Sequence, residues 1–77
     1  MTGTAAEELG QRVRERRLKR GMSQVELAKA CGIHDTYLSS IEGGRRNVGL
    51  DILVRLSWAL EVDPGTLVRG IGRPPPG

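Results

Sequence analysis

The chain has 77 residues, with twelve lysines and arginines against nine aspartates and glutamates, which gives a formal net charge of +3. This length suffices for one small domain, and a single cysteine with a single histidine excludes an internal disulfide and leaves no credible metal site. No apolar run reaches the roughly 18 residues of a membrane-spanning helix, and the first residues lack the apolar core of a signal peptide, so we expect a soluble, cytoplasmic protein.

The first predicted helix covers about residues 5–19. Thr4 and Glu7 have the spacing of a capping box, in which each side chain bonds a free backbone amide at the helix start. Apolar residues follow at a four-residue spacing, and Gly21 ends the segment. The apolar stripe continues to Arg17, and a guanidinium on the buried face of a helix requires an acceptor.

Two short helices come next, joined by a turn that contains a glycine. Ser23 and Glu26 repeat the capping box before an amphipathic segment at about residues 24–31. After the turn, His34 or Asp35 caps a third helix that runs to the next glycine pair. Ala28 is small where the two helices are expected to cross, and the side chains expected to lock the pair are Leu27, Cys31, Ile33, Leu38 and Ile41.

The last third of the chain predicts two more helices. Three- and four-residue spacings give a fourth helix whose inward face consists of Leu50, Leu53, Leu56, Ser57 and Leu60. Asp63 as a cap and Pro64 at the first helical position predict a short fifth helix that ends near Arg69. We therefore expect an all-α domain over residues 1–70, with a mobile tail rich in proline and glycine over residues 71–77.

Two short helices around a glycine turn are what a helix-turn-helix DNA reader requires. The segment SQVELAKACGIHDTYLSSIEGGRRN, residues 23–47, resembles the helix-turn-helix of the phage repressor and Cro (XRE-like) family in its caps, turn and apolar positions. The segment GIHDTYLSSIEGGRRNVGLDIL, residues 32–53, is most similar to the controller proteins of restriction–modification systems. The resemblance implies a compact, lambda-repressor-like bundle of five helices that binds DNA sequence-specifically as a homodimer, with the helix at about residues 34–43 in the major groove.

Candidate DNA contacts fall into two groups. Side chains on the exposed side of the third helix are candidates to read base edges, namely Asp35, Thr36, Ser39 and Ser40. Candidates for contacts to backbone phosphates, several of them supported by the resemblance, are Gln24, His34, Tyr37, Arg45, Arg46 and Asn47. Two alternatives stay open: Asp35 is equally suited to a plain helix cap, and Tyr37 to packing on the preceding helix.

The resemblance also implies two contacts between elements. One is an ion pair of Arg17 with Glu42, which would tie the first helix to the third in a structural role. The other is a two-fold interface through the fourth and fifth helices, for which the candidates are Val54, Trp58, Leu67, Val68 and Ile71. The alternative for Trp58 is that it folds back over the tail of its own chain.

No side chains suggest catalysis, so we expect no enzyme, and no cofactor, metal or small-molecule ligand. The expected partners are a double-stranded DNA operator, a second copy of the chain and, if the protein activates transcription, RNA polymerase. Repression or activation is left open by the sequence. The competing interpretation is an antitoxin-like or adaptor module that uses the same scaffold to bind protein.

Overall fold

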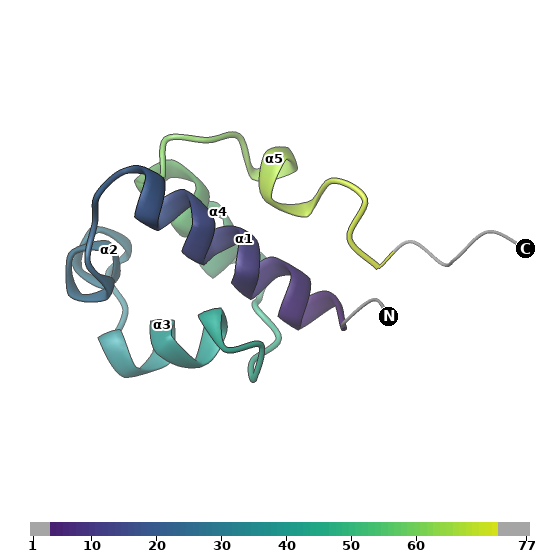
Figure 1. Ribbon diagram of the computed structural model, residues 1–77, viewed down its shortest axis with the longest axis horizontal. Coiled ribbons are helices and arrows are strands. Elements are labelled where there is room, and N and C mark those ends of the chain that lie inside the picture. The colour runs from purple at the N-terminus through teal and green to yellow at the C-terminus, as the bar shows by residue number, and fades with distance from the viewer. Residues whose placement is uncertain (1–3, 73–77) are drawn as a thin grey trace, which may run out of the picture.

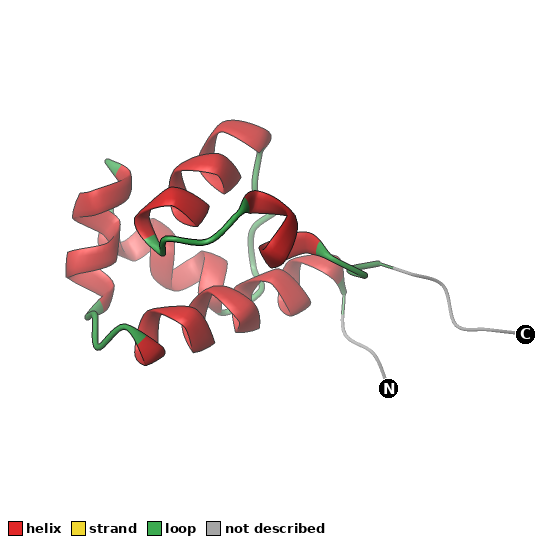
Figure 2. Ribbon diagram, turned by 90° about the horizontal axis from the view of Figure 1, so that it is seen from above, coloured by secondary structure: helices red, strands yellow, loops and turns green. Residues whose placement is uncertain are grey.

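Five helices follow one another through short connections in the computed structural model, which describes residues 4–72 (Figure 1). They are α1 (Ala5–Lys19), α2 (Gln24–Cys31), α3 (Asp35–Glu42), α4 (Leu50–Ala59) and α5 (Pro64–Val68). Figure 2 shows that loops alone join them, with no strand in the described part of the chain. The all-α prediction is confirmed, and the predicted bounds of α1 and α2 agree with the structure.

Local signals account for how α1 and α2 begin. At both starts, a hydroxyl accepts from the backbone N–H three residues on, and a glutamate accepts from the backbone N–H of the capping residue. In the second box, the Glu26 N–H lies 3.0 Å from the Ser23 hydroxyl, and the Ser23 N–H lies 2.8 Å from the Glu26 carboxylate. The turn after α2 passes through Gly32 at φ +70°, a conformation that a residue with a Cβ rarely adopts.

One core joins all five helices. Its buried apolar members are Leu9, Val13, Leu27, Ala28, Cys31, Leu38, Ile41, Leu56, Leu60 and Leu67. In Figure 1, α1 lies between α3 and α5 and contacts both. Gly10 permits the crossing with α3, because a Cβ there would lie 2.2 Å from the carbonyl oxygen of Ile41.

The structure corrects the predicted inward face of α4. Leu56, Ser57 and Leu60 are buried, and the Ser57 hydroxyl donates to the Val54 carbonyl at 2.7 Å. Leu50, however, is 76% exposed. It is the first residue of the helix, and the first turn extends past the core, so the three- and four-residue spacing alone placed this residue wrongly.

The short α5 brings the chain back onto α1. Asp63 caps it by accepting from the Gly65 N–H at 3.0 Å, and Leu67 inserts fully into the core. Beyond the helix, Ile71 packs on the core and the Gly72 N–H donates to Glu8. The rest of the predicted tail, residues 73–77, lies outside the described residues, so the domain boundary near residue 70 stays a prediction. Among residues 4–72, no helix is both long and apolar enough to cross a membrane.

Candidate nucleic-acid interface

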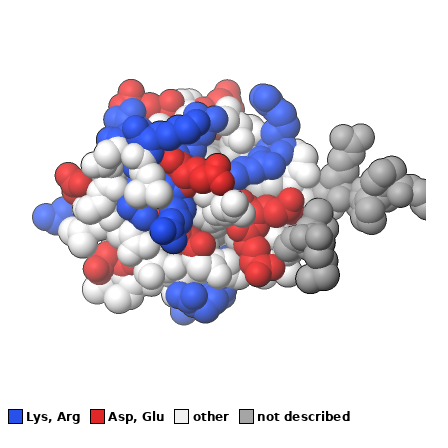
Figure 3. All heavy atoms as spheres, in the orientation of Figure 1, with Lys and Arg blue, Asp and Glu red and all other residues white. Residues whose placement is uncertain are grey.

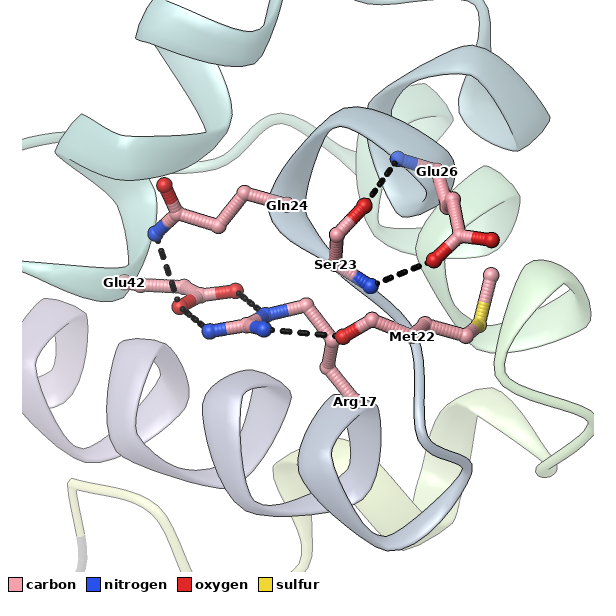
Figure 4. A network of polar contacts seen from close by, with 6 residues as sticks. All are labelled: Arg17, Met22, Ser23, Gln24, Glu26 and Glu42. Carbon is pink, nitrogen blue, oxygen red and sulfur yellow. Dashed lines mark hydrogen bonds and ion pairs between the residues drawn. The ribbon is translucent and has the colours of Figure 1, made fainter.

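A buried polar network holds the starts and ends of three helices in place (Figure 4). The Arg17 guanidinium donates from Nε and Nη2 to the two carboxylate oxygens of Glu42, at 2.7 and 2.9 Å. Its Nη1 donates to the Met22 carbonyl, just before α2, at 2.9 Å. The hydrogen bonds to Glu42 raise the pKa of Arg17, with burial opposing the change. The ion pair that the family resemblance implies is therefore present, and it fixes the two helices of the motif against α1.

The exposed face of α3 carries short polar side chains. Thr36 and Asp35 are exposed, whereas Ser39 and Ser40 are half-buried. The opposite face is fixed in the core by Leu38 and Ile41. A helix held by one face alone leaves its other face free to enter a groove, and this free face begins with Asp35 and Thr36.

His34 occupies the capping position of α3, but its side chain makes no capping hydrogen bond there. Its Nδ1 instead lies 3.5 Å from the carboxylate of Asp35, and both side chains are exposed. Asp35 is the first helical residue, where a negative charge favours the helix N-terminus. The capping alternative for Asp35 is thus not realised, because the capping position belongs to its neighbour.

The segment after α3 carries the cationic side of the site. The Arg46 guanidinium lies over the Tyr37 ring, 5.8 Å from its centroid, and the Tyr37 side chain is half-buried. This stacking places Arg46 beside α3 rather than free in solvent. Tyr37 thereby supports an arginine, a role that sequence reasoning did not foresee.

The start of α1 lies against the same segment. An open hollow of about 270 Å³ is lined by Thr4, Ala5, Ala6, Gly44, Arg45, Arg46 and Asn47. Gly44 has φ +75° and lies over Glu7, since a Cβ there would come within 2.9 Å of the Glu7 Cα. This proximity is not predictable from the sequence, because no local pattern links residues so far apart in the chain.

Gln24, the first residue of α2, is not a free side chain. Its Nε2 donates to the Glu42 carboxylate at 3.1 Å. Figure 4 shows the amide oxygen on the side away from Glu42. The amide therefore belongs to the buried network as well as to the candidate phosphate contacts.

The candidate interface between two copies is only partly accessible. Leu67 has no exposed surface and cannot contact a second chain, because α5 turns it into the core. Trp58 is 63% exposed and Val54 is half-buried; together they line one side of a hollow of about 600 Å³ that α2 bounds on the other. The alternative was that Trp58 folds back over the tail of its own chain. The part of the tail that the structure describes, residues 71 and 72, does not bury it.

Within residues 4–72 there is no cluster of metal-binding side chains and no buried polar side-chain atom without a partner. Burial raises the pKa of the Cys31 thiol, and the charge of Arg55 opposes this only in part, so the thiol stays protonated at neutral pH. Figure 3 shows basic and acidic side chains interspersed on the face in view, so individual residues, rather than one field, define the site.

Known proteins are similar to this chain in sequence and architecture. The family model described as helix-turn-helix matches residues 13–67. The control protein C.BamHI of Bacillus amyloliquefaciens is 52% identical over 60 residues, covering 77% of this chain and 74% of that protein. The crystal structure of the restriction-modification controller protein C.AhdI from Aeromonas hydrophila matches at 39% identity with a TM-score of 0.79, covering 80% of this chain and 94% of that one. The biofilm regulator SinR, in complex with DNA, matches at 38% identity with a TM-score of 0.73, covering 77% and 95%.

Proposed function

The chain belongs to the helix-turn-helix family of DNA-binding transcription regulators, and from this premise we propose that it binds a double-stranded DNA operator sequence-specifically as a homodimer. Its relatives are regulators and controller proteins rather than enzymes. One observation carries the proposal. The side of α3 opposite its buried face is open, and α3 is contacted by the start of α2, through Gln24 at Glu42, and by the cationic segment, through Arg46 at Tyr37.

In this proposal α3 enters the major groove. An α-helix with its side chains is about 10–12 Å in diameter, which fits a major groove about 12 Å wide. Thr36 offers a methyl to thymine or a hydroxyl to several bases, and Asp35 accepts from cytosine N4. Ser39 and Ser40 lie one turn further along, where they reach a base only if the helix lies deep.

Phosphate contacts flank α3 on two sides. On one side, the N-terminus of α2 presents its backbone N–H groups together with Gln24. On the other side are Arg45, Arg46 and Asn47, of which Arg46 is held in place by Tyr37. His34 is a further candidate, exposed at the start of α3. These contacts position the protein without specifying sequence.

The two-fold partner meets the outer face of α4. Leu50, Val54 and Trp58 follow at a four-residue spacing, so they form one stripe on the side of the helix away from the core. Val68, 39% exposed on α5, and the half-buried Ile71 are secondary candidates. Pairing through this face places two α3 helices in successive major grooves, about 34 Å apart.

The test begins with selection of binding sites from random DNA, followed by affinity measurements across salt concentrations. We expect a pseudo-palindromic site and an affinity that falls by about 0.9 log unit per log unit of salt for each phosphate contacted. An affinity that ignores salt and sequence would overturn the proposal. It would favour the antitoxin-like or adaptor interpretation, in which apolar contacts to a protein dominate.

Two substitutions separate the assigned roles. Arg46→Ala should weaken binding to all sequences alike and reduce the salt slope by about one phosphate per subunit. Thr36→Ala should instead relax preference at one base pair per half-site, by about 1–3 kcal/mol. If Arg46→Ala affects only the selected site, Arg46 reads bases and the assignment is reversed. RNA polymerase remains a candidate partner only for activation.

A further inference from the structure

A hollow between α1 and α5 gathers basic side chains on the side of α1 away from α3. Its volume is about 210 Å³, and its lining residues are Arg12, Glu15, Arg16, Lys19, Thr66 and Leu67. In Figure 1, α5 and α3 lie on opposite sides of α1. A protein whose α3 occupies a DNA groove therefore leaves this hollow open to another molecule.

The three basic residues of the hollow share one stripe of α1, because positions 12, 16 and 19 are four and three residues apart. Like charges at a four-residue spacing destabilise a helix, so an anion between Arg12 and Arg16 would relieve a repulsion. Within residues 4–72 none of the three forms an ion pair, whereas Arg17 of the same helix is paired with an acid. The hollow therefore carries positive charge that no salt bridge in the described chain offsets.

Arg12 is held at the wall of the hollow. Its Nη1 donates to the Leu67 carbonyl at 3.2 Å, which is the one hydrogen bond of this side chain to the described residues. A guanidinium has several N–H donors, so the others are left for an outside acceptor. Arg16 is half-buried one turn further along α1. Two guanidinium groups restrained in this way suit a carboxylate, which binds arginine through two parallel hydrogen bonds.

The size and charge of the hollow favour a single acidic side chain as its occupant. At about 210 Å³ it is smaller than pockets for small molecules, which measure about 300–1,000 Å³. Glu15, exposed at the hollow, is the one acid among its lining residues. It would repel a duplex, whose phosphates place a charge about every 1.7 Å along the axis, more strongly than one carboxylate between two arginines. Nucleic acid is therefore the poorer fit.

We propose that this hollow binds an acidic segment of a second protein. A glutamate or aspartate of that segment lies between Arg12 and Arg16, and Lys19 attracts the charge beside it. The site is separate from the proposed operator contacts, so the protein holds DNA and this partner at the same time. A regulator with such a site brings the acidic protein to the operator.

The first test uses the full chain without DNA. The probe is a capped peptide of alternating glutamate and glycine, and the control peptide has glutamine in place of glutamate. In ¹⁵N-labelled protein, the acidic peptide should shift the backbone amide resonances of residues 12–19 and 66–67, and the glutamine peptide should leave them unchanged. Equal effects of the two peptides, or shifts confined to residues 43–47, would overturn the proposal.

Substitutions around the hollow give the second test, with affinity measured by the anisotropy of a fluorescently labelled acidic peptide. Arg16→Gln should weaken binding about tenfold. Arg14→Gln is the matched control, because it removes the same charge from an exposed position of α1 outside the hollow, and it should change the affinity less than about twofold. Glu15→Gln should strengthen binding about twofold, since it removes a repulsion. Equal losses for Arg14→Gln and Arg16→Gln would indicate unspecific attraction by charge and overturn the proposal.

Arg12→Gln should weaken the peptide at least as much as Arg16→Gln does. Arg12 also bonds the Leu67 carbonyl, so its removal can loosen α5. Arg16 makes no side-chain hydrogen bond to residues 4–72, so Arg16→Gln keeps the test decisive if Arg12→Gln alters the fold.

Competition distinguishes the acidic segment from other anions. Inorganic phosphate at matched ionic strength should not displace the peptide, and displacement would indicate a site for free anions instead. Protein saturated with operator should bind the peptide as the free protein does, and loss of binding would show that DNA covers the hollow. Peptide binding by a protein without salt-dependent DNA binding would support this site while the proposed function fails, so the two proposals are tested separately.

Discussion

The contact between α1 and α3 and the outer face of α4 differ in how completely their groups are partnered. At the first, Gly10 brings two backbones together, and Arg17 and Glu42 are paired inside. At the second, Leu50 and Trp58 are more than half exposed, and the ion pair of Asp51 with Arg55 lies in solvent. The first region needs nothing from outside the chain, while the second has apolar surface left to bury.

The difference between the two regions indicates two separate roles in one small domain, one in folding and one in association. The α1–α3 contact fixes the geometry of the reading helix, so changes there should affect folding before they affect DNA. In the proposed homodimer the α4 face sets association with the second copy, so changes there should leave the fold intact. Substitutions in the two regions can therefore test whether their roles are separate.

The largest expected effect comes from removing one member of the buried ion pair. Arg17→Met should cost about 4 kcal/mol in the free energy of unfolding, because Glu42 is left buried with only Gln24 as a partner. Urea unfolding followed by circular dichroism measures the loss. Adding Glu42→Leu should recover most of it, and a double variant no more stable than the worse single one would contradict the pairing.

Gly10→Ala tests the close approach of α1 and α3. The new methyl would overlap backbone oxygens of α3, which cannot move aside as a side chain does, so we expect a loss of about 2–3 kcal/mol. The matched control is Gly65→Ala in α5, where a Cβ meets only ordinary contact. That variant should be neutral or gain about 0.5 kcal/mol in the same urea experiment. Equal losses for both would place the cost in the helix backbone and not in the crossing.

Trp58→Ala tests the open face. The loss should amount to about 2 kcal/mol in the free energy of dimerisation, roughly thirtyfold in the dissociation constant, with no change in the monomer's fold. Sedimentation across micromolar concentrations measures it. Leu18→Ala, at another exposed apolar side chain but on α1, is the control and should leave association unchanged. A Trp58→Ala protein that remains a full dimer would rule out this face.

The smallest effect concerns the helix starts. Hydrogen bonds from the backbone N–H and hydroxyl of Ser23 lower the pKa of Glu26 below its ordinary value of 4.5, and Thr4 does the same for Glu7. A carboxylate whose pKa is lower when folded contributes stability above its unfolded pKa and loses it as pH falls through the folded pKa. Glu26→Gln, which keeps the capping geometry, should therefore unfold with a weaker dependence on pH below about 4.5. An unchanged dependence would exclude this capping box.

Elements with local signals were predictable from the sequence. Capping boxes, glycine turns and Pro64 gave the helices, and the buried stripe on α1 pointed to a partner for Arg17. Those signals lie within a few residues of each other, and the family resemblance supplied Glu42 across the chain.

The features that could not be predicted from the sequence depend on contacts between residues far apart in the chain. Leu67 was placed at the two-fold interface because the resemblance implied an interface through the fourth and fifth helices. A helix of five residues has too little periodicity to define its inner face, and only docking on α1 decides it. The prediction that Leu50 faces inward was wrong for the opposite reason, because the apolar spacing of the helix continues beyond the end of the core. Gly10 carries no local signature of a helix crossing. The bond from Gln24 to Glu42 joins residues whose proximity exists only once three helices have packed.

Cys31, buried where α2 meets the core, is a natural probe of how often α2 opens away from the rest of the domain. Because the sequence has a single thiol and the folded state shields it, a disulfide reagent reacts only while α2 is transiently separated from its neighbours. The rate of thiol modification then reports the free energy of that opening without any introduced label. A DNA duplex that binds only the closed form would slow the modification of Cys31 as more of the protein becomes bound. The rate of thiol modification would then also measure operator binding.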